Sequence, residues 1–322
     1  MPQNKKIDLF FYINLFCNDK CSFCFFSKLP PRDNFLRLAD IRKVFNQLGE
    51  NNIRGIILTG GEPTLNPDFW KIIDYIYNVY IKTNKVREFD LSTNAITSAK
   101  INIAKKIEKY FTSFDENYPD IKISFSFSSF KNPSRQKIID KKIEGIKNLM
   151  KINGNIESVI VITKENYKDI LEITKLLIQL HKKKKTKRYF FKVDYRLPYA
   201  SMMYRIDDLK KLIIPFKDFS NVLNKVLDLI RKENIYTTLH NIPLCYIKNK
   251  PEYFIGRKPP QGIAIFPDKK TGFVKRKKMF EFDKNTECDG CKLKRQCSGI
   301  EKIYLENYNY LKLKPLIYEI IN

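Results

Sequence analysis

The chain has 322 residues, 43% of them hydrophobic and 13% aromatic, so it can bury a large core, and wholesale disorder is excluded. Lysine and arginine outnumber aspartate and glutamate by 60 to 35, which gives a net charge of +25. Because the basic residues are spread along the chain, as the codon usage of an AT-rich genome would produce, we do not expect a nucleic-acid partner. No apolar run is long enough to span a bilayer and the first six residues lack signal-peptide features, which predicts a cytoplasmic protein without a membrane partner.

Strand and helix patterns alternate over roughly the first 200 residues. Strands are expected at residues 6–14, 53–58, 86–91, 121–129, 156–163 and 189–197. Helices are expected at residues 38–48 with Gly49 as the stop, from Pro67 with Asn66 as N-cap, through 103–107, at 134–152 and at 169–180. Repeated strand–helix units predict an α/β fold with a parallel sheet and helices outside, and right-handed crossovers curl six units into an open, partial (β/α)6 barrel with functional residues at the carboxyl ends of the strands.

The pattern changes after Pro198. A long amphipathic helix is expected at about 218–233 and a short strand at 236–239, followed by a stretch rich in proline and glycine from 248 to 286. Such a stretch buries little core by itself and would benefit from a metal site. We therefore predict a barrel domain at residues 1–215 and a small C-terminal domain at residues 216–322.

Seven cysteines fall into two groups and one single residue, a distribution that suggests metal sites rather than disulfides in a reducing compartment. In the first group, Cys17, Cys21 and Cys24 follow the first predicted strand. Three thiolates fill three corners of a cubane 4Fe–4S cluster and leave one iron open, as a site that performs chemistry requires. A zinc site with a borrowed fourth ligand is the alternative, but no histidine or further cysteine lies nearby in the sequence.

The segment from Cys17 to Cys24 resembles the C-x3-C-x-aromatic-C loop of the radical S-adenosylmethionine (SAM) superfamily, with Phe23 as the aromatic residue. The resemblance implies an enzyme whose 4Fe–4S cluster binds exchangeable SAM and cleaves it reductively to methionine and a 5′-deoxyadenosyl radical, which abstracts a hydrogen atom from the substrate. It makes Cys17, Cys21 and Cys24 catalytic ligands and places Phe23 beside the adenine. For Phe23, a place in the core is an equal alternative.

Gly60, Gly61 and Glu62, followed by Pro63, come after the second predicted strand, where the superfamily carries a Gly-Gly-Glu-Pro motif. Glycine permits close backbone approach, and a carboxylate can receive the ammonium of SAM, although a Gly-Gly pair alone is usually just a turn. Further contacts to SAM that the resemblance implies are Asn94, Ser126, Ser128 and Arg196. Relatives often carry glycine where this chain has Ala95 and aspartate where it has Ser128, and an ion pair with Asp194 is the alternative for Arg196.

The second group of cysteines, Cys288-x2-Cys291-x5-Cys297, supplies four thiolates if Cys245 joins it. Four thiolates close either a zinc site or a 4Fe–4S cluster. The spacing resembles the core of SPASM and Twitch domains, the C-terminal extensions of many radical SAM enzymes, which implies one auxiliary 4Fe–4S cluster that conducts electrons or stabilises the fold. Cys245 could instead be a buried thiol.

The resemblance leads us to expect a peptide maturase that acts on a ribosomally synthesised peptide and takes electrons from a flavodoxin or ferredoxin. Only about a dozen residues precede the cysteine loop, too few for a leader-binding winged-helix module. The alternative is a small-molecule radical dehydrogenase or a cofactor-biosynthesis enzyme. An RNA-modifying enzyme comes last, because no RNA-binding module is recognisable.

Overall fold

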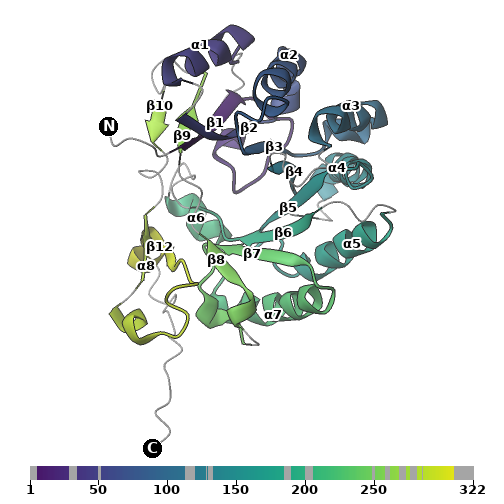
Figure 1. Cartoon of the computed structure of the whole chain (residues 1–322). Coiled ribbons are helices and arrows are strands. Elements are labelled where there is room, and N and C mark those ends of the chain that lie inside the picture. The colour runs from purple at the N-terminus through teal and green to yellow at the C-terminus, as the bar shows by residue number, and fades with distance from the viewer. Residues whose placement is uncertain are drawn as a thin grey trace, which may run out of the picture.

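The computed structural model describes residues 6–28, 35–49, 52–112, 120–127, 129, 133–184, 190–199, 206–248, 251–257, 262–267, 273–275, 281–284 and 286–307. A ten-stranded sheet forms its centre, in the order β10-β9-β1-β2-β3-β4-β5-β6-β7-β8 (Figure 1). The six barrel strands are β1 (Ile7–Asn14), β2 (Ile53–Gly60), β3 (Glu88–Thr93), β4 (Asp120–Ser126), β5 (Asn155–Val161) and β6 (Phe191–Arg196). All neighbouring pairs among these six are parallel, which confirms the predicted partial radical SAM-type barrel.

Helices cover the outer face of this sheet (Figure 1). They are α1 (Leu38–Leu48), α2 (Phe69–Ile76), α3 (Ile101–Phe111), α4 (Gln136–Leu149), α5 (Ile170–Lys182) and α7 (Phe216–Lys232). The short helix α6 (Ile206–Leu212) lies instead beside the segment that follows β5, where the Lys164 amide donates to the Leu212 carbonyl (2.7 Å). Each of the helices α1 to α5 buries an apolar stripe, as a helix that packs on a sheet must. No helix in the described ranges is long and apolar enough to cross a membrane.

The prediction that α2 begins at Pro67 was wrong, because α2 begins at Phe69 with Asp68 as its N-cap. Asn66 Oδ1 still accepts from the Asp68 amide (2.7 Å), as the predicted cap would, and the same side chain also makes two long-range contacts. Its amide donates to the carbonyl oxygens of Ile13 (2.6 Å) and Leu36 (3.0 Å), so it ties the end of β1 to the segment that enters α1. The stop of α1 at Gly49 is confirmed, with Gly49 at a φ of 73°.

The sheet continues at both sides of the six barrel strands. β7 (Tyr236–His240) and β8 (Ile255–Arg257) add in parallel after β6, while β9 (Ile263–Ile265) pairs in parallel with β1 and antiparallel with β10 (Phe273–Lys275). A separate two-stranded sheet, β11 (Phe282–Asp283) and β12 (Ile300–Glu301), precedes α8 (Lys302–Asn307). The domain boundary at residues 215 and 216 stays a prediction; the hydrogen-bonded sheet runs past it through β7 to β10.

Charged side chains fill the amino-terminal end of the barrel interior. Their ion pairs join neighbouring strands: Arg54 with Asp8 and Glu88, Lys122 with Glu88, and Lys192 with Glu157. Buried charges of this kind are tolerated when each has a partner. Because this end is filled by paired charges, the interior is left for chemistry at the carboxyl ends of the strands, where the predicted site residues lie.

Candidate functional site

Gly60 and Gly61 let the end of β2 touch the chain that enters the cysteine loop. The Gly61 amide donates to the Asn14 carbonyl (2.9 Å) and the Glu62 amide donates to the Phe16 carbonyl (2.8 Å). A Cβ atom on Gly60, whose φ is +130°, would lie 2.3 Å from the Asn14 oxygen, and one on Gly61 would lie 2.0 Å from the Phe16 oxygen. Both positions therefore require glycine for close approach, as the motif predicted.

The Glu62 carboxylate is fully buried and ties the ends of β2 and β3 together. One oxygen accepts from the hydroxyls of Thr64 (2.6 Å) and Thr93 (2.7 Å) and from the Thr64 amide, while the other accepts from the Asn94 amide (2.6 Å). Burial raises the pKa of Glu62, and these hydrogen bonds oppose that rise. Its contact with the ammonium of SAM stays a prediction; in this conformation the carboxylate braces two strand ends.

Asn94 lies against the cysteine loop. Its side-chain amide donates to Asn18 Oδ1 (2.7 Å) and to Cys17 Sγ (3.4 Å). The next residue, Ala95, adopts a left-handed φ of 66° although it carries a Cβ. The turn that glycine usually makes in relatives is thus kept here by alanine, and Gly145 of α4 makes room for it, because a Cβ there would lie 1.8 Å from the Ala95 oxygen.

Asp19 lies between two of the predicted ligands in the sequence and forms ion pairs with two basic side chains, one from α4 and one from the turn before it. Lys142 Nζ lies 2.7 Å from Asp19 Oδ2, and Arg135 pairs with Asp19 Oδ1. The Cys21 thiol donates to Asp19 Oδ2 (3.3 Å), and the Asp19 amide donates to Cys17 Sγ (3.4 Å). Burial alone would raise the pKa of Asp19, but Lys142 and Arg135 hold it below its usual value, so Asp19 is an anion in the loop.

The three loop cysteines are free thiols on one short segment, which is the donor set of a three-thiolate iron–sulfur site. Burial raises the pKa of Cys17 to about 11 and that of Cys21 to about 12, and also raises the pKa of Cys24. Binding iron must therefore release protons from these thiols. As they stand, no three cysteine, histidine or carboxylate side chains of the described residues could hold a single metal ion.

A cavity of about 230 Å³ opens beside the cysteine loop. Cys21 and Phe23 line it from the loop, Arg135 and Lys142 from α4 and the turn before it, and Asn166 from the segment after β5. A hydrogen bond from the Ser22 hydroxyl to the Glu165 carboxylate (2.6 Å) joins the loop to that last segment. The structure thus brings Phe23 to a polar cavity next to the predicted cluster rather than into the main core.

On β6, Arg196 pairs with Asp194 through Nη2 (2.7 Å) and Nε (3.2 Å), which is the alternative that the sequence left open. His240 at the end of β7 donates from Nε2 to the same carboxylate (3.1 Å), and its Nδ1 lies 3.0 Å from the Tyr199 hydroxyl. Burial would raise the pKa of Asp194, but Arg196 and His240 hold it well below its usual range. The inward contact of Arg196 with SAM stays a prediction.

The two predicted serines differ in what the structure says of them. Ser126 ends β4 and is partly buried, two residues after Ser124, whose hydroxyl donates to the buried Asp90 (2.9 Å). Because side chains alternate along a strand, Ser126 shares the inner face with Ser124. Ser128 lies outside the described residues, so its place is not established.

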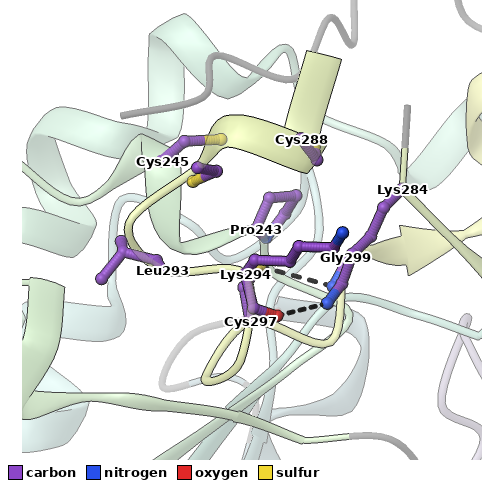
Figure 2. Close-up of a pocket in the computed structure, with 9 residues that line it drawn as sticks. Pro243, Cys245, Lys284, Cys288, Leu293, Lys294, Cys297 and Gly299 are labelled. Carbon is purple, nitrogen blue, oxygen red and sulfur yellow. Dashed lines mark hydrogen bonds between the residues drawn. The ribbon is translucent and has the colours of Figure 1, made fainter. Parts of the chain in front are cut away.

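Cys245 and the three clustered cysteines near the C-terminus line one pocket (Figure 2). Cys245 follows β7, whereas Cys288, Cys291 and Cys297 lie between β11 and β12. The Gly299 amide donates to Cys297 Sγ (3.4 Å), and Gly299 has a φ of 78° that favours glycine. Four thiols around one pocket fit either a zinc ion or a 4Fe–4S cluster by their chemistry.

This pocket is attached to the carboxyl end of β6 and β7. The Asn241 side chain donates to the Pro198 carbonyl (3.1 Å) and accepts from the Glu301 amide (2.8 Å), and the Tyr304 hydroxyl also donates to the Pro198 carbonyl. At β8, the Gly256 amide donates to the carbonyl of Gln296, the residue before Cys297. The second cysteine site is therefore held beside the barrel strands that carry Arg196 and His240.

Sequence reasoning missed Asp19, Arg135, Lys142 and His240. The one available signal concerned Lys142, which occupies a position of the α4 stripe that otherwise holds Ile139, Ile146 and Leu149. A lysine at an apolar position of a helix indicates a buried partner, but it does not name that partner. The others carry no periodic signal.

Comparison with known proteins agrees with this geometry. The family model described as the Radical SAM superfamily matches residues 11–177, just over half of the chain. A GTP 3′,8-cyclase of Aliarcobacter butzleri is 25% identical over 166 residues, which cover 49% of this chain and 47% of that protein. A GTP 3′,8-cyclase of Photorhabdus laumondii is 36% identical over 110 residues, which cover 31% of this chain and 30% of that protein. The chain spans less than half the length of these curated relatives.

Solved structures share the fold over nearly the whole chain. Streptococcus suis SuiB bound to the precursor peptide SuiA superposes with a TM-score of 0.58 at 16% identity, covering 92% of this chain and 72% of that one. Native anSMEcpe with bound AdoMet superposes with a TM-score of 0.57 at 14% identity, covering 91% of this chain and 88% of that one. At these identities the likeness concerns the fold, including the C-terminal cysteine-rich region. The family model covers the cysteine loop, the glycine pair and the barrel as far as α5, so the chain belongs to the radical SAM superfamily and is a radical SAM enzyme.

Proposed function

We propose that Cys17, Cys21 and Cys24 hold a 4Fe–4S cluster with one open iron, and that the enzyme uses SAM bound there to abstract a hydrogen atom from a peptide. When bound, the cluster supplies the electron that splits SAM into methionine and a 5′-deoxyadenosyl radical. The observation that carries this proposal is the cysteine loop clamped against Gly60 and Gly61, with a cavity opening beside Cys21.

Two residues of the cavity suit parts of SAM, and residues at the neighbouring strand ends would add further contacts. Phe23 offers an aromatic surface to the adenine, and Arg135, which lines the cavity and exposes 28% of its side chain, offers a guanidinium to the methionine carboxylate. Asn94 keeps Cys17 in place, and the backbone at Gly60 and Gly61 can approach SAM closely because no side chain intervenes. Ser126 and Arg196 complete the inner wall of the barrel in this proposal.

A peptide substrate is supported by what the structural neighbours bind. SuiB is described with the precursor peptide SuiA, and anSMEcpe is also described with the Cp18Cys peptide. Both align over the C-terminal region as well as the barrel, since they cover 92% and 91% of this chain. The net charge of +25 would suit an acidic peptide in the cytoplasm.

A second candidate is a small-molecule radical enzyme. It is favoured by the sequence matches to GTP 3′,8-cyclases, which reach 36% identity, whereas SuiB with its bound precursor peptide is 16% identical. The two matches reported above cover 49% and 31% of this chain. GTP is therefore kept as an alternative substrate.

For the second site we propose one auxiliary 4Fe–4S cluster on Cys245, Cys288, Cys291 and Cys297. Four thiolates would close its coordination, which favours electron transfer or a structural role over substrate binding. Support comes from the shared pocket of the four thiols and from the cysteine-rich region of the structural neighbours. A structural zinc ion is the alternative with the same donor set.

The substrate class can be tested with reconstituted enzyme, SAM, and flavodoxin or dithionite as reductant. One reaction receives a mixture of acidic peptides and another receives GTP. In each, the rate of 5′-deoxyadenosine formation is measured, and mass spectrometry shows whether the peptides or GTP have changed in mass. We expect acceleration and a mass change with the peptides. Acceleration with GTP alone, with conversion of GTP, would move the assignment to the second candidate.

A further inference from the structure

We propose that Lys142 is a positioning residue that raises the reduction potential of the cluster at Cys17, Cys21 and Cys24. The inference rests on the proposed function, since it concerns the cluster that those thiols would hold. Its basis is the buried ammonium of Lys142, which the fold places beside the cysteine loop.

Lys142 occupies a buried position, where a lysine lowers stability unless its charge is compensated. It lies in the middle of α4 on the stripe of that helix that faces inward, and only 6% of its side chain is exposed. Burying an ammonium is unfavourable unless a partner compensates for its lost hydration. The partner is Asp19, whose side chain is 3% exposed and whose Oδ2 lies 2.7 Å from Lys142 Nζ.

Asp19 alone would cancel this charge, but Asp19 has a second cation. Arg135 pairs with the other carboxylate oxygen, so two positive groups meet one negative group. These three groups together carry one positive charge, and the Glu165 carboxylate, which lines the same cavity, accepts a hydrogen bond from the Ser22 hydroxyl (2.6 Å). Because Arg135 is partly exposed and Lys142 is buried, Lys142 is the less screened of the two.

The Lys142 ammonium is close to a predicted ligand. Lys142 Nζ and Cys21 Sγ bind the same oxygen, at 2.7 Å and 3.3 Å, so Nζ and Sγ are no more than 6.0 Å apart, the sum of the two distances. Asp19 also contacts a second predicted ligand, because its backbone amide donates to Cys17 Sγ. A rigid helix thus presents a cation to two of the three thiols.

A cluster gains one negative charge when it is reduced, and its potential depends on nearby net charge and hydrogen bonds. A unit charge 6 Å away in an effective dielectric constant of about 20 changes an equilibrium constant by on the order of a hundredfold. Cavity water beside Cys21 reduces that effect. We therefore expect removal of the Lys142 charge to disfavour reduction by about tenfold, which is 59 mV for a one-electron couple.

The test is a potentiometric titration of the reconstituted full-length enzyme, followed by electron paramagnetic resonance. The signal that changes when SAM is added is assigned to the cluster with the open iron. Lys142→Met should shift its reduction equilibrium about tenfold toward the oxidised form, whereas Lys142→Arg should stay within threefold of the wild type. Lys147→Met on the same helix, where the side chain is 44% exposed, is the matched control and should also stay within threefold.

A shift smaller than threefold for iron-replete Lys142→Met, or a shift of opposite sign, overturns the inference. If Lys142→Met does not retain its cluster, Asp19→Asn decides, because it leaves both cations and removes the anion. That variant should favour reduction by more than threefold, and an unchanged or less favourable reduction overturns the inference. Absence of any SAM-sensitive cluster signal in the wild type would instead refute the proposed function, so the two failures are distinguishable.

Discussion

A methyl group at position 61 tests whether the glycine pair shapes the cysteine loop. In Gly61→Ala the new Cβ would lie 2.0 Å from the Phe16 oxygen and 3.0 Å from the Cys17 nitrogen, whereas ordinary contacts begin at 3.4 Å. The Phe16 carbonyl must retreat by 1.4 Å, the difference between contact and the available space. That displacement breaks the 2.8 Å hydrogen bond from the Glu62 amide and moves Cys17 with it.

The expected cost follows from the groups left without partners. An unsatisfied buried amide or carbonyl costs about 1–3 kcal/mol, so the free energy of unfolding should fall by about that amount. The measurement is urea unfolding of the purified chain, together with iron quantification after reconstitution, in which Gly61→Ala should lose iron from the first site. Gly290→Ala is the matched control, because it also neighbours a predicted ligand, Cys291, but its Cβ meets nothing within 4 Å. Equal stability and iron content in the two variants would refute the reasoning.

Three other substitutions test the interior charges and the second cysteine site. Burial raises the pKa of Asp90 to about 7 against the opposing effect of Lys122, so the folded state loses stability relative to the unfolded state as pH rises from about 4 through 7. In urea unfolding, Asp90→Asn should therefore raise the free energy of unfolding by up to about 4 kcal/mol at pH 8 and by less at pH 5. An equal gain at the two pH values would contradict this. Asp194→Asn leaves Arg196 without its buried partner and should lower the free energy of unfolding by about 3 kcal/mol at pH 7. Because the pKa of Asp194 is held low, the wild type loses the stability of this ion pair only as acid protonates the carboxyl. A stability difference between wild type and variant that grows on acidification would therefore argue against the pair. Cys245→Ala should lower the iron content from about eight toward about four per chain, and a count that stays near eight would remove Cys245 from the ligand set.

The barrel and the family were predictable because their signals are local. Strand and helix periodicities predicted six parallel strands, and the spacing of Cys17, Cys21 and Cys24 predicted the superfamily, which the family model confirms. Gly60 and Gly61 were also readable, since close backbone approach leaves few choices of residue. The roles of the individual side chains toward SAM stay predictions.

The rest depends on contacts between distant segments, which no periodicity encodes. Asn66 was predicted as a helix cap and its Oδ1 does accept from the Asp68 amide, but the sequence did not indicate that its amide joins β1 to the entry of α1. The contact of Glu62 with SAM stays a prediction, and the sequence did not indicate the four hydrogen bonds that hold its carboxylate between two strand ends. Lys142 and Asp19 are 123 positions apart and meet only because α4 packs beside the loop. Such pairs follow from the register of strands and the placement of helices.

The most direct test of the central claim is SAM cleavage by the iron-replete enzyme. Reconstituted wild type is reduced with dithionite in the presence of SAM, and 5′-deoxyadenosine and methionine are quantified by liquid chromatography with mass spectrometry. The account predicts equal amounts of the two products from the wild type and none above background from Cys21→Ala. An iron-replete wild type that forms no 5′-deoxyadenosine, or a Cys21→Ala variant that forms as much, would contradict the claim that this loop holds the catalytic cluster.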